Sequence, residues 1–325
     1  MESKYPCRYC GCKYVYDLYS ARDIRDNEWH VYKCIACNLY FLTPEPTEEQ
    51  LKQAYDTSYY GEGKKKFGVS VEKFIDHFRK RKARYITSLI PENSKVLDFG
   101  CGSGMFLQHL SLLGRYELYG HEIEGIAAQR ASNFNELNLK VGALKESDYP
   151  EDYFDAITMY HVWEHLEKPK TVLTILSRSL KKDGMFVLSF PNIKSMQSRL
   201  FKGRWYHLDP PRHLSFYSVP DFIRIMKNEG FSLVNTKRFS FEQNPYGWVQ
   251  SILNCFFRKR EILYERLKGN STYCPECSNL NIFCQKLFFA ITLPLFFLLD
   301  IIESLLGISA TVQLTFRKNI KKIEK

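Results

Sequence analysis

Four cysteines near the N-terminus occur as two CxxC pairs, Cys7 with Cys10 and Cys34 with Cys37. Four thiolates in tetrahedral geometry hold zinc in a closed site, and in a small module the metal supplies much of the folding free energy. The spacing therefore predicts a structural zinc site, in which Cys12 could replace Cys10. Reduced thiols without metal are the alternative, and a closed site predicts no catalytic role.

A second, weaker group of cysteines lies toward the C-terminus. Cys274 and Cys277 form its one CxxC pair, Cys284 lies near them, and Cys255 is more distant. The group predicts either a second zinc site or a surface loop with free thiols. Ten cysteines in 325 residues are too few for a disulfide scaffold, and the N-terminus has no apolar signal-peptide core. We therefore expect a reducing, cytoplasmic compartment.

A glycine-rich turn follows the apolar run Val96–Phe99 and precedes an apolar helix. Its glycines stand at alternate positions, Gly100, Gly102 and Gly104. Glycine lets the backbone approach a ligand that a side chain would block, and the start of the helix offers free N–H donors. Asp98, just before the turn, suits an ammonium or hydroxyl group better than a pyrophosphate. Glu122 closes the next expected strand, where an acid hydrogen-bonds ribose hydroxyls.

Three histidines and one glutamate form a second group of residues whose side chains could take part in catalysis. His161, Glu164 and His165 are spaced i, i+3 and i+4, so a helical turn would place them on one face. His213 lies beyond the expected strand Met185–Phe190. A histidine can take a proton from an acceptor hydroxyl, and a divalent metal can lower the pKa of that hydroxyl. We predict Glu164, His165 and His213 as catalytic residues, with capping and packing as the alternative for the Glu164–His165 pair.

The elements that position these residues belong to an α/β pattern. Short apolar runs alternate with helical stretches between residues 95 and 239, which is typical of a mostly parallel sheet. The expected strands are Lys95–Phe99, Glu117–Gly120, Asp155–Tyr160, Met185–Phe190 and Phe231–Arg238, followed much later by a closing strand at Thr311–Phe316. The glycine turn, Glu122 and His161 each come at or just after the end of one of these strands.

We expect five segments along the chain. They are a zinc-ribbon module at 1–45, a helical lead-in at 46–92, a Rossmann-like core at 93–240, a helical hydrophobic insertion at 241–309, and a closing strand with a basic tail at 310–325. Aromatic strands are expected in the module at Trp29–Tyr32 and Leu39–Leu42. Thr47 and Gln50 form a capping box at the start of the lead-in.

Charge and hydropathy point to a polyanionic neighbour. The composition is that of a folded globular chain, which excludes disordered and fibrous classes. The chain has 46 Lys and Arg residues and 36 Asp and Glu residues, so its net charge is 46 − 36 = +10. This charge suits a nucleic acid or an anionic membrane surface as partner. The apolar run Leu287–Leu299 is shorter than the roughly 20 residues that span a bilayer, and it contains Pro294. We expect a helical hairpin in the membrane interface at about 282–307, with a buried core or dimer helix as the alternative.

The glycine turn and two later runs resemble those of the class I S-adenosylmethionine-dependent methyltransferases. Tyr153–Pro169 is similar to the family's fourth motif, and Leu180–Asn192 is similar to its fifth strand and the following loop. The resemblance implies that Gly100, Gly102 and Gly104 border the methionine part of the cofactor, that Glu122 holds its ribose, and that His161 faces the sulfonium. Val141–Leu144 lacks the acid that many members carry beside the adenine.

The flanking segments resemble a narrower group, bacterial methyltransferases of sugar and surface-polysaccharide biosynthesis. The similarity rests on the cysteine module, on Phe41–Pro46, on Gly203–Trp205 and on Pro211–Ser218. It implies methyl transfer to a hydroxyl group of a sugar or lipid-linked glycan. The apolar segment and the basic charge add the expectation that the protein works at the cytoplasmic face of a membrane.

Other resemblances keep alternatives open. Glu164, His165 and His213 resemble the metal ligands of small-RNA 2′-O-methyltransferases and ubiquinone-pathway O-methyltransferases, which implies a second, divalent metal ion, although His161 stands where those enzymes carry a first Glu. The alternatives are an RNA methyltransferase with a zinc module and a non-catalytic cofactor-binding scaffold. Nucleic acid is the less favoured partner, because the chain lacks an NPPY-type tetrapeptide.

Overall fold

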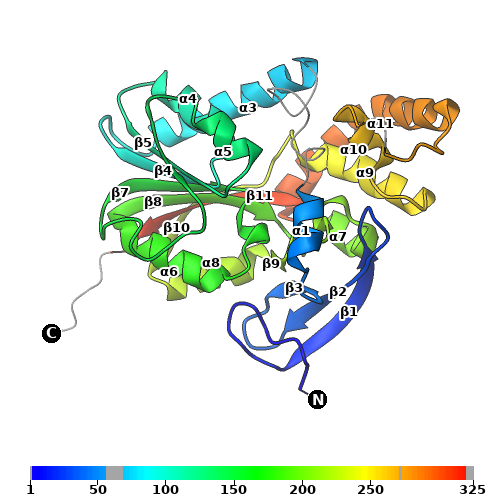
Figure 1. Ribbon diagram of the computed structural model, residues 1–325, viewed down its shortest axis with the longest axis horizontal. Coiled ribbons are helices and arrows are strands. Elements are labelled where there is room, and N and C mark those ends of the chain that lie inside the picture. The colour runs from blue at the N-terminus through cyan, green and yellow to red at the C-terminus, as the bar shows by residue number, and fades with distance from the viewer. Residues whose placement is uncertain (1, 56–68, 271–272, 320–325) are drawn as a thin grey trace. The chain divides into compact units, whose positions relative to one another are not determined.

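The computed structural model describes residues 2–55, 69–270 and 273–319 (Figure 1). The chain forms two compact units. The first contains Met1–Glu72, Phe190–Asp221 and Lys237–Val312. The second contains Lys73–Ser189, Phe222–Thr236 and Gln313–Lys325. The glycine turn, Glu122, His161 and Glu164 therefore belong to the second unit.

A seven-stranded sheet organises the fold, with the strand order β10-β11-β8-β7-β4-β5-β6. Its strands are β4 (Lys95–Phe99), β5 (Glu117–Glu122), β6 (Leu137–Val141), β7 (Phe154–Tyr160), β8 (Leu180–Pro191), β10 (Phe231–Lys237) and β11 (Thr311–Lys318). β4 runs parallel to both β5 and β7, β5 to β6, and β7 to β8. The predicted α/β fold with a Rossmann-like sheet is confirmed. The edge strand β6 is not among the predicted strands, because its side chains are mostly exposed and it has no apolar run.

Helices cover both faces of this sheet. Figure 1 shows α3 (Val69–Thr87), α4 (Met105–Ser111) and α5 (Ile126–Ala131) on one side, with α6 (Pro169–Ser179) and α8 (Val219–Asn228) on the other. Apolar side chains of α3, α4 and β4 form one buried cluster that includes Ile86, Leu107 and Val96. Cys101 of the glycine turn and Phe106 of α4 belong to the same cluster, so this packing helps to fix the position of the turn.

The first unit contains a four-stranded antiparallel sheet in the order β1-β2-β3-β9. The strands are β1 (Val15–Arg22), β2 (Glu28–Cys34), β3 (Tyr40–Thr43) and β9 (Ser215–Phe216). Tyr40 pairs with Phe216 across the β3–β9 ladder. Trp29 of β2 shares a buried apolar cluster with Trp205 and Leu208. The N-terminal strands therefore pack against residues that are far away in the sequence.

Helices make up much of the rest of the first unit. They are α1 (Glu48–Ala54), α7 (Met196–Phe201), α9 (Asn244–Phe256), α10 (Ile262–Leu267) and α11 (Asn279–Leu306). The Thr47 hydroxyl accepts from the amide of Gln50 at 3.2 Å, and the Gln50 side chain accepts from the amide of Thr47 at 2.9 Å. The predicted capping box is confirmed.

The prediction of a helical hairpin at about 282–307 is wrong. A single helix of 28 residues, α11, passes through Pro294. The hydroxyl of Ser278 caps its start, and Gly307 ends it with φ +74°. Pro294 removes one backbone donor but no turn residue follows it, so the helix continues.

The prediction that the apolar segment is too short to cross a membrane is also wrong. α11 extends beyond the apolar run at both ends and is about 42 Å long at 1.5 Å per residue. It is long and apolar enough to cross a membrane, with a mean hydropathy of 2.0 over its most apolar window. Core helices of soluble proteins can pass this test too, but they are mostly buried, whereas 11% of this window is buried.

Candidate active site and metal centre

The site residues of the second unit lie at one edge of the sheet. Because β4, β5 and β7 are parallel, their carboxyl ends meet there, at Phe99, Glu122 and Tyr160. Ligands of open α/β sheets bind outside this edge. The glycine turn after β4 and the segment that begins with His161 after β7 therefore face the same region.

The glycine turn has backbone conformations that favour glycine. The φ angles are +76° at Gly100, +57° at Gly102 and +74° at Gly104. A Cβ at Gly100 would lie 2.3 Å from Cγ2 of Val162, whereas a Cβ at Gly102 would have no atom within 4 Å. Gly100 thus permits close packing of the next loop. Gly102 borders open space, where a ligand can approach the backbone.

Glu122 fixes the geometry of this turn. Its Oε2 accepts a hydrogen bond from the amide of Gly102 at 2.6 Å, and its Oε1 accepts one from the amide of Ile123 at 3.0 Å. Partial burial raises the pKa of Glu122, while these two amides lower it. Each carboxylate oxygen accepts about two hydrogen bonds, so each keeps a lone pair for a ligand hydroxyl.

Asp98 lies buried below the turn, with 4% of its surface exposed. Its Oδ1 accepts a hydrogen bond from the hydroxyl of Thr158 at 2.6 Å. Burial, together with the negative charge of Glu122, raises the pKa of Asp98 to about 7, against the lowering effects of Thr158 and Lys82. Its contact with a cofactor ammonium stays a prediction. Sequence reasoning missed Thr158, whose signal is a polar residue inside an apolar parallel strand.

His161 and Glu164 contact each other, but not on one helical turn as predicted. The helix after β7 is a single 3-10 turn, Trp163–His165, and His161 precedes it with φ +55°. The amide of His161 donates to the carbonyl of Ser189 at 3.0 Å, which ends the β7–β8 ladder. Nδ1 of His161 lies 3.2 Å from Oε1 of Glu164, whose side chain is fully buried. His165 ends the turn and is partly exposed.

His213 belongs to the first unit. Its Nδ1 lies 2.8 Å from the carbonyl oxygen of His207, so this nitrogen donates, and its Nε2 lies 3.7 Å from Oδ2 of Asp209. Nε2 is therefore the ring nitrogen on the side of the Asp209 carboxylate. The grouping of His213 with Glu164 and His165 stays a prediction.

The four predicted zinc ligands lie together in the first unit. The sulfur atoms of Cys7, Cys10, Cys34 and Cys37 all lie within 4.8 Å of one another. The Cys7–Cys37 and Cys10–Cys34 sulfur distances are 3.5 and 3.6 Å. A tetrahedral zinc ion with Zn–S bonds of about 2.3 Å requires sulfurs about 3.8 Å apart, so the cluster fits zinc. Cys12 is not part of it, since its sulfur lies 3.7 Å from the carbonyl oxygen of Tyr14.

The surroundings of the cluster favour a thiolate at Cys37. The Cys7 thiol donates to it and lowers the pKa of Cys37 to about 5, and the Tyr217 hydroxyl also donates to it, at 3.7 Å. Tyr217 directly follows β9. The residue after β9 therefore contacts one of the four clustered cysteines.

The second cysteine pair is different. The structure joins Cys274 and Cys277 in a disulfide, so the predictions of free thiols or of a second zinc site there are wrong. A disulfide sulfur is no thiolate and does not ligate zinc in this form. Cys255 and Cys284 are free and exposed.

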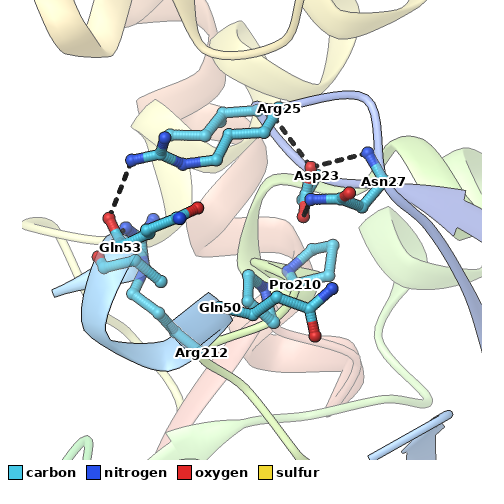
Figure 2. A pocket seen from close by; sticks show the side chains of 10 residues that line it. Asp23, Arg25, Asn27, Gln50, Gln53, Pro210 and Arg212 are labelled. Atoms are coloured by element: carbon cyan, nitrogen blue, oxygen red, sulfur yellow. Dashed lines mark hydrogen bonds between the residues drawn. The ribbon is translucent and has the colours of Figure 1, made fainter. Parts of the chain in front are cut away.

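A hollow in the first unit lies between the loop at Asp23 and helix α1 (Figure 2). Arg25 donates across it to the carbonyl of Gln53 at 2.9 Å. The Asp23 carboxylate accepts from the amides of Arg25 and Asn27 and from the indole of Trp29. Arg212, on the wall of the hollow, donates to Asp209 and to the carbonyl of Ala54. These polar groups hold the walls together, so we assign the hollow no ligand.

Comparison with known proteins identifies the family of the central part of the chain. Residues 72–236 match the family described as "Methyltransferase domain", which is half of the chain. The chain belongs to this family. It is a class I S-adenosylmethionine-dependent methyltransferase, as the resemblance of its glycine turn and later motifs predicts.

The curated relatives are named as O-methyltransferases. The chain is 25% identical over 171 residues to the ubiquinone biosynthesis O-methyltransferase of Ruegeria sp., covering 49% of this chain and 67% of the relative. It is 33% identical over 103 residues to the mitochondrial ubiquinone biosynthesis O-methyltransferase of Schizosaccharomyces pombe, covering 29% and 37%. For the relative from Glaesserella parasuis, the chain spans less than half of the relative's length, 45%.

Solved structures of other proteins are similar to this chain at low sequence identity. An S-adenosylmethionine-dependent methyltransferase from Mesorhizobium loti is 14% identical, with a TM-score of 0.43 and coverage of 72% of this chain and 96% of that one. The YcgJ protein from Bacillus subtilis is 16% identical, with a TM-score of 0.46 and coverage of 75% and 99%.

Proposed function

We propose that the protein transfers a methyl group from S-adenosylmethionine to a hydroxyl group of a lipid-linked glycan or sugar, at the cytoplasmic face of a membrane. The observation that carries the methyl-transfer part is the open backbone at Gly102, held by the Glu122 carboxylate at the edge of the sheet. The names of the curated relatives favour oxygen as the methylated atom.

The cofactor supplies an electrophilic methyl group on a sulfonium. In our proposal, the residues of this chain bind and orient it. The remaining lone pairs of Glu122 take the ribose hydroxyls, since charge-assisted hydrogen bonds are stronger than neutral ones. The backbone of Gly100, Gly102 and Gly104 borders the methionine part. His161 stands at the end of β7, the position proposed to face the sulfonium.

Transfer to oxygen also requires removal of the hydroxyl proton. We propose that His165 or His213 takes this proton, or that both join Glu164 in holding a divalent metal that lowers the pKa of the acceptor. The zinc ion proposed at Cys7, Cys10, Cys34 and Cys37 is structural, because four sulfurs leave it no open position.

A polyprenylated phenol is the second candidate acceptor. It is favoured by the curated relatives, whose names place them in ubiquinone biosynthesis. Both candidates present a hydroxyl group on a lipid carrier. RNA is the alternative with different chemistry, and it would bind with a steep dependence on salt.

Transfer of labelled methyl groups tests the proposal directly. The protein is incubated with labelled cofactor and with lipid-linked glycan, polyprenylated phenol or RNA fractions. We expect product in the glycan fraction and a fall in turnover of about 100-fold in His213→Ala, with cofactor affinity unchanged. Loss of activity with chelator and recovery with Mn²⁺ would identify a metal rather than a direct base. Label in RNA alone would refute the acceptor, and full activity of both His165→Ala and His213→Ala would refute the catalytic residues.

A further inference from the structure

Helix α11 exposes a broad apolar face. Leu280, Phe283, Ile291, Leu298, Ile302 and Leu305 each expose between 51% and 83% of their surface. At about 100° per residue, the exposed positions of α11 span about 200° of its circumference. The seam of a coiled coil is narrower and is flanked by charged positions. This face is therefore wider than one partner helix covers.

The opposite face of α11 is fixed to α9. Asn244 donates to the Asp300 carboxylate at 2.7 Å, and Trp248 donates to the Glu303 carboxylate at 3.3 Å. The rings of Trp248 and Phe296 stack with centroids 5.7 Å apart. Asp300 and Glu303 are the acidic residues of α11, and both are fully buried. The exposed face consequently carries no negative charge.

The charge of that face and of the whole chain favours an anionic surface. Lys286 is the one charged residue of the exposed face, and the chain has a net charge of +10. An apolar face of this width, with its acids turned inward, suits the boundary between headgroups and acyl chains. A single partner helix would leave much of the 200° arc in water.

We infer that α11 lies flat in the interface of an anionic lipid bilayer, with its Leu280–Leu305 face in the lipid and its Asp300–Glu303 face on α9. A spanning orientation would require α11 to leave α9. That would expose the buried cluster of Trp248, Val249 and Leu253 and break both carboxylate hydrogen bonds. The inference deepens the proposed function, on which it rests for a lipid-linked acceptor, by naming the surface on which the enzyme works.

Vesicle flotation tests this orientation in the full-length protein. The vesicles are phosphatidylcholine alone, and phosphatidylcholine mixed with phosphatidylglycerol. We expect the wild type to float with the anionic vesicles, and the double variant Ile291→Asp, Leu298→Asp to bind at least tenfold less. Leu112→Asp is the matched control, because Leu112 is 79% exposed on the second unit. It should float like the wild type.

Two further measurements keep the outcomes distinct. If the double variant is unfolded, tryptophan is introduced at Leu298 and, as a control, at Leu112; brominated lipid should quench the first and not the second. Wild type that stays in the soluble fraction with both vesicle types would overturn the inference, and so would a concentration-dependent dimer that the double variant abolishes. Cofactor affinity is measured by calorimetry in every sample. Flotation without cofactor binding would refute the proposed function and leave the lipid contact standing.

Discussion

Replacing Glu122 by Ala tests the cofactor site at its most constrained point. The carboxylate accepts from the amides of Gly102 and Ile123, and its remaining lone pairs are the proposed acceptors for the ribose. A charge-assisted hydrogen bond contributes about 1.5–3 kcal/mol. Loss of even one therefore weakens binding by about 10- to 100-fold. Loss of the support for Gly102 adds to this effect.

The fold itself should tolerate the change. Burial raises the pKa of Glu122, so the charged carboxylate is less favourable in the folded chain than in water. Its removal also takes away a negative charge that acts on Asp98. We therefore expect an unfolding midpoint close to that of the wild type, while the dissociation constant of the cofactor rises at least tenfold.

Calorimetric titration with S-adenosylmethionine and with its demethylated product measures the effect. Glu124→Ala is the matched control, since Glu124 is exposed two residues further along the same loop. Its affinity should equal that of the wild type. Equal affinity of Glu122→Ala and wild type would show that the carboxylate does not contact the cofactor, and an equal loss in both variants would show a general effect of loop charge.

Two other predictions concern the metal and the buried acid. Metal analysis should find about one zinc ion per chain in the wild type. The double variant Cys34→Ser, Cys37→Ser should lose this zinc, whereas the control Cys12→Ser should keep it. Zinc retained in the double variant would place the metal elsewhere. Since the pKa of Asp98 rises from 3.8 to about 7 on folding, its protonated form is favoured in the native state, and its contribution to stability declines as the pH rises from about 4 to about 7. Urea unfolding of the wild type and of Asp98→Asn measures this effect. The difference in their free energies of unfolding, wild type minus variant, should fall across this pH range and stay constant above it. A difference that does not change with pH would contradict the assignment.

The local parts of this protein follow from its sequence. The strand, turn and helix around Gly100–Gly104 are visible because apolar periodicity and glycine spacing are properties of neighbouring residues. The acid at Glu122 follows from its place at the end of the next strand. The four clustered cysteines are visible for a similar reason, since each CxxC pair sits in one short stretch of the chain.

Tertiary structure alone decided the contacts that join distant segments. Nothing near Phe216 indicates that it pairs with Tyr40, because strand pairing depends on how the intervening chain folds back. The orientation of α11 has the same origin. Its sequence is apolar almost all round, so periodicity does not choose an inner face. Asn244 and Trp248 of α9 donate hydrogen bonds to Asp300 and Glu303, so the face of α11 that carries these acids is buried. The opposite face of α11 stays exposed.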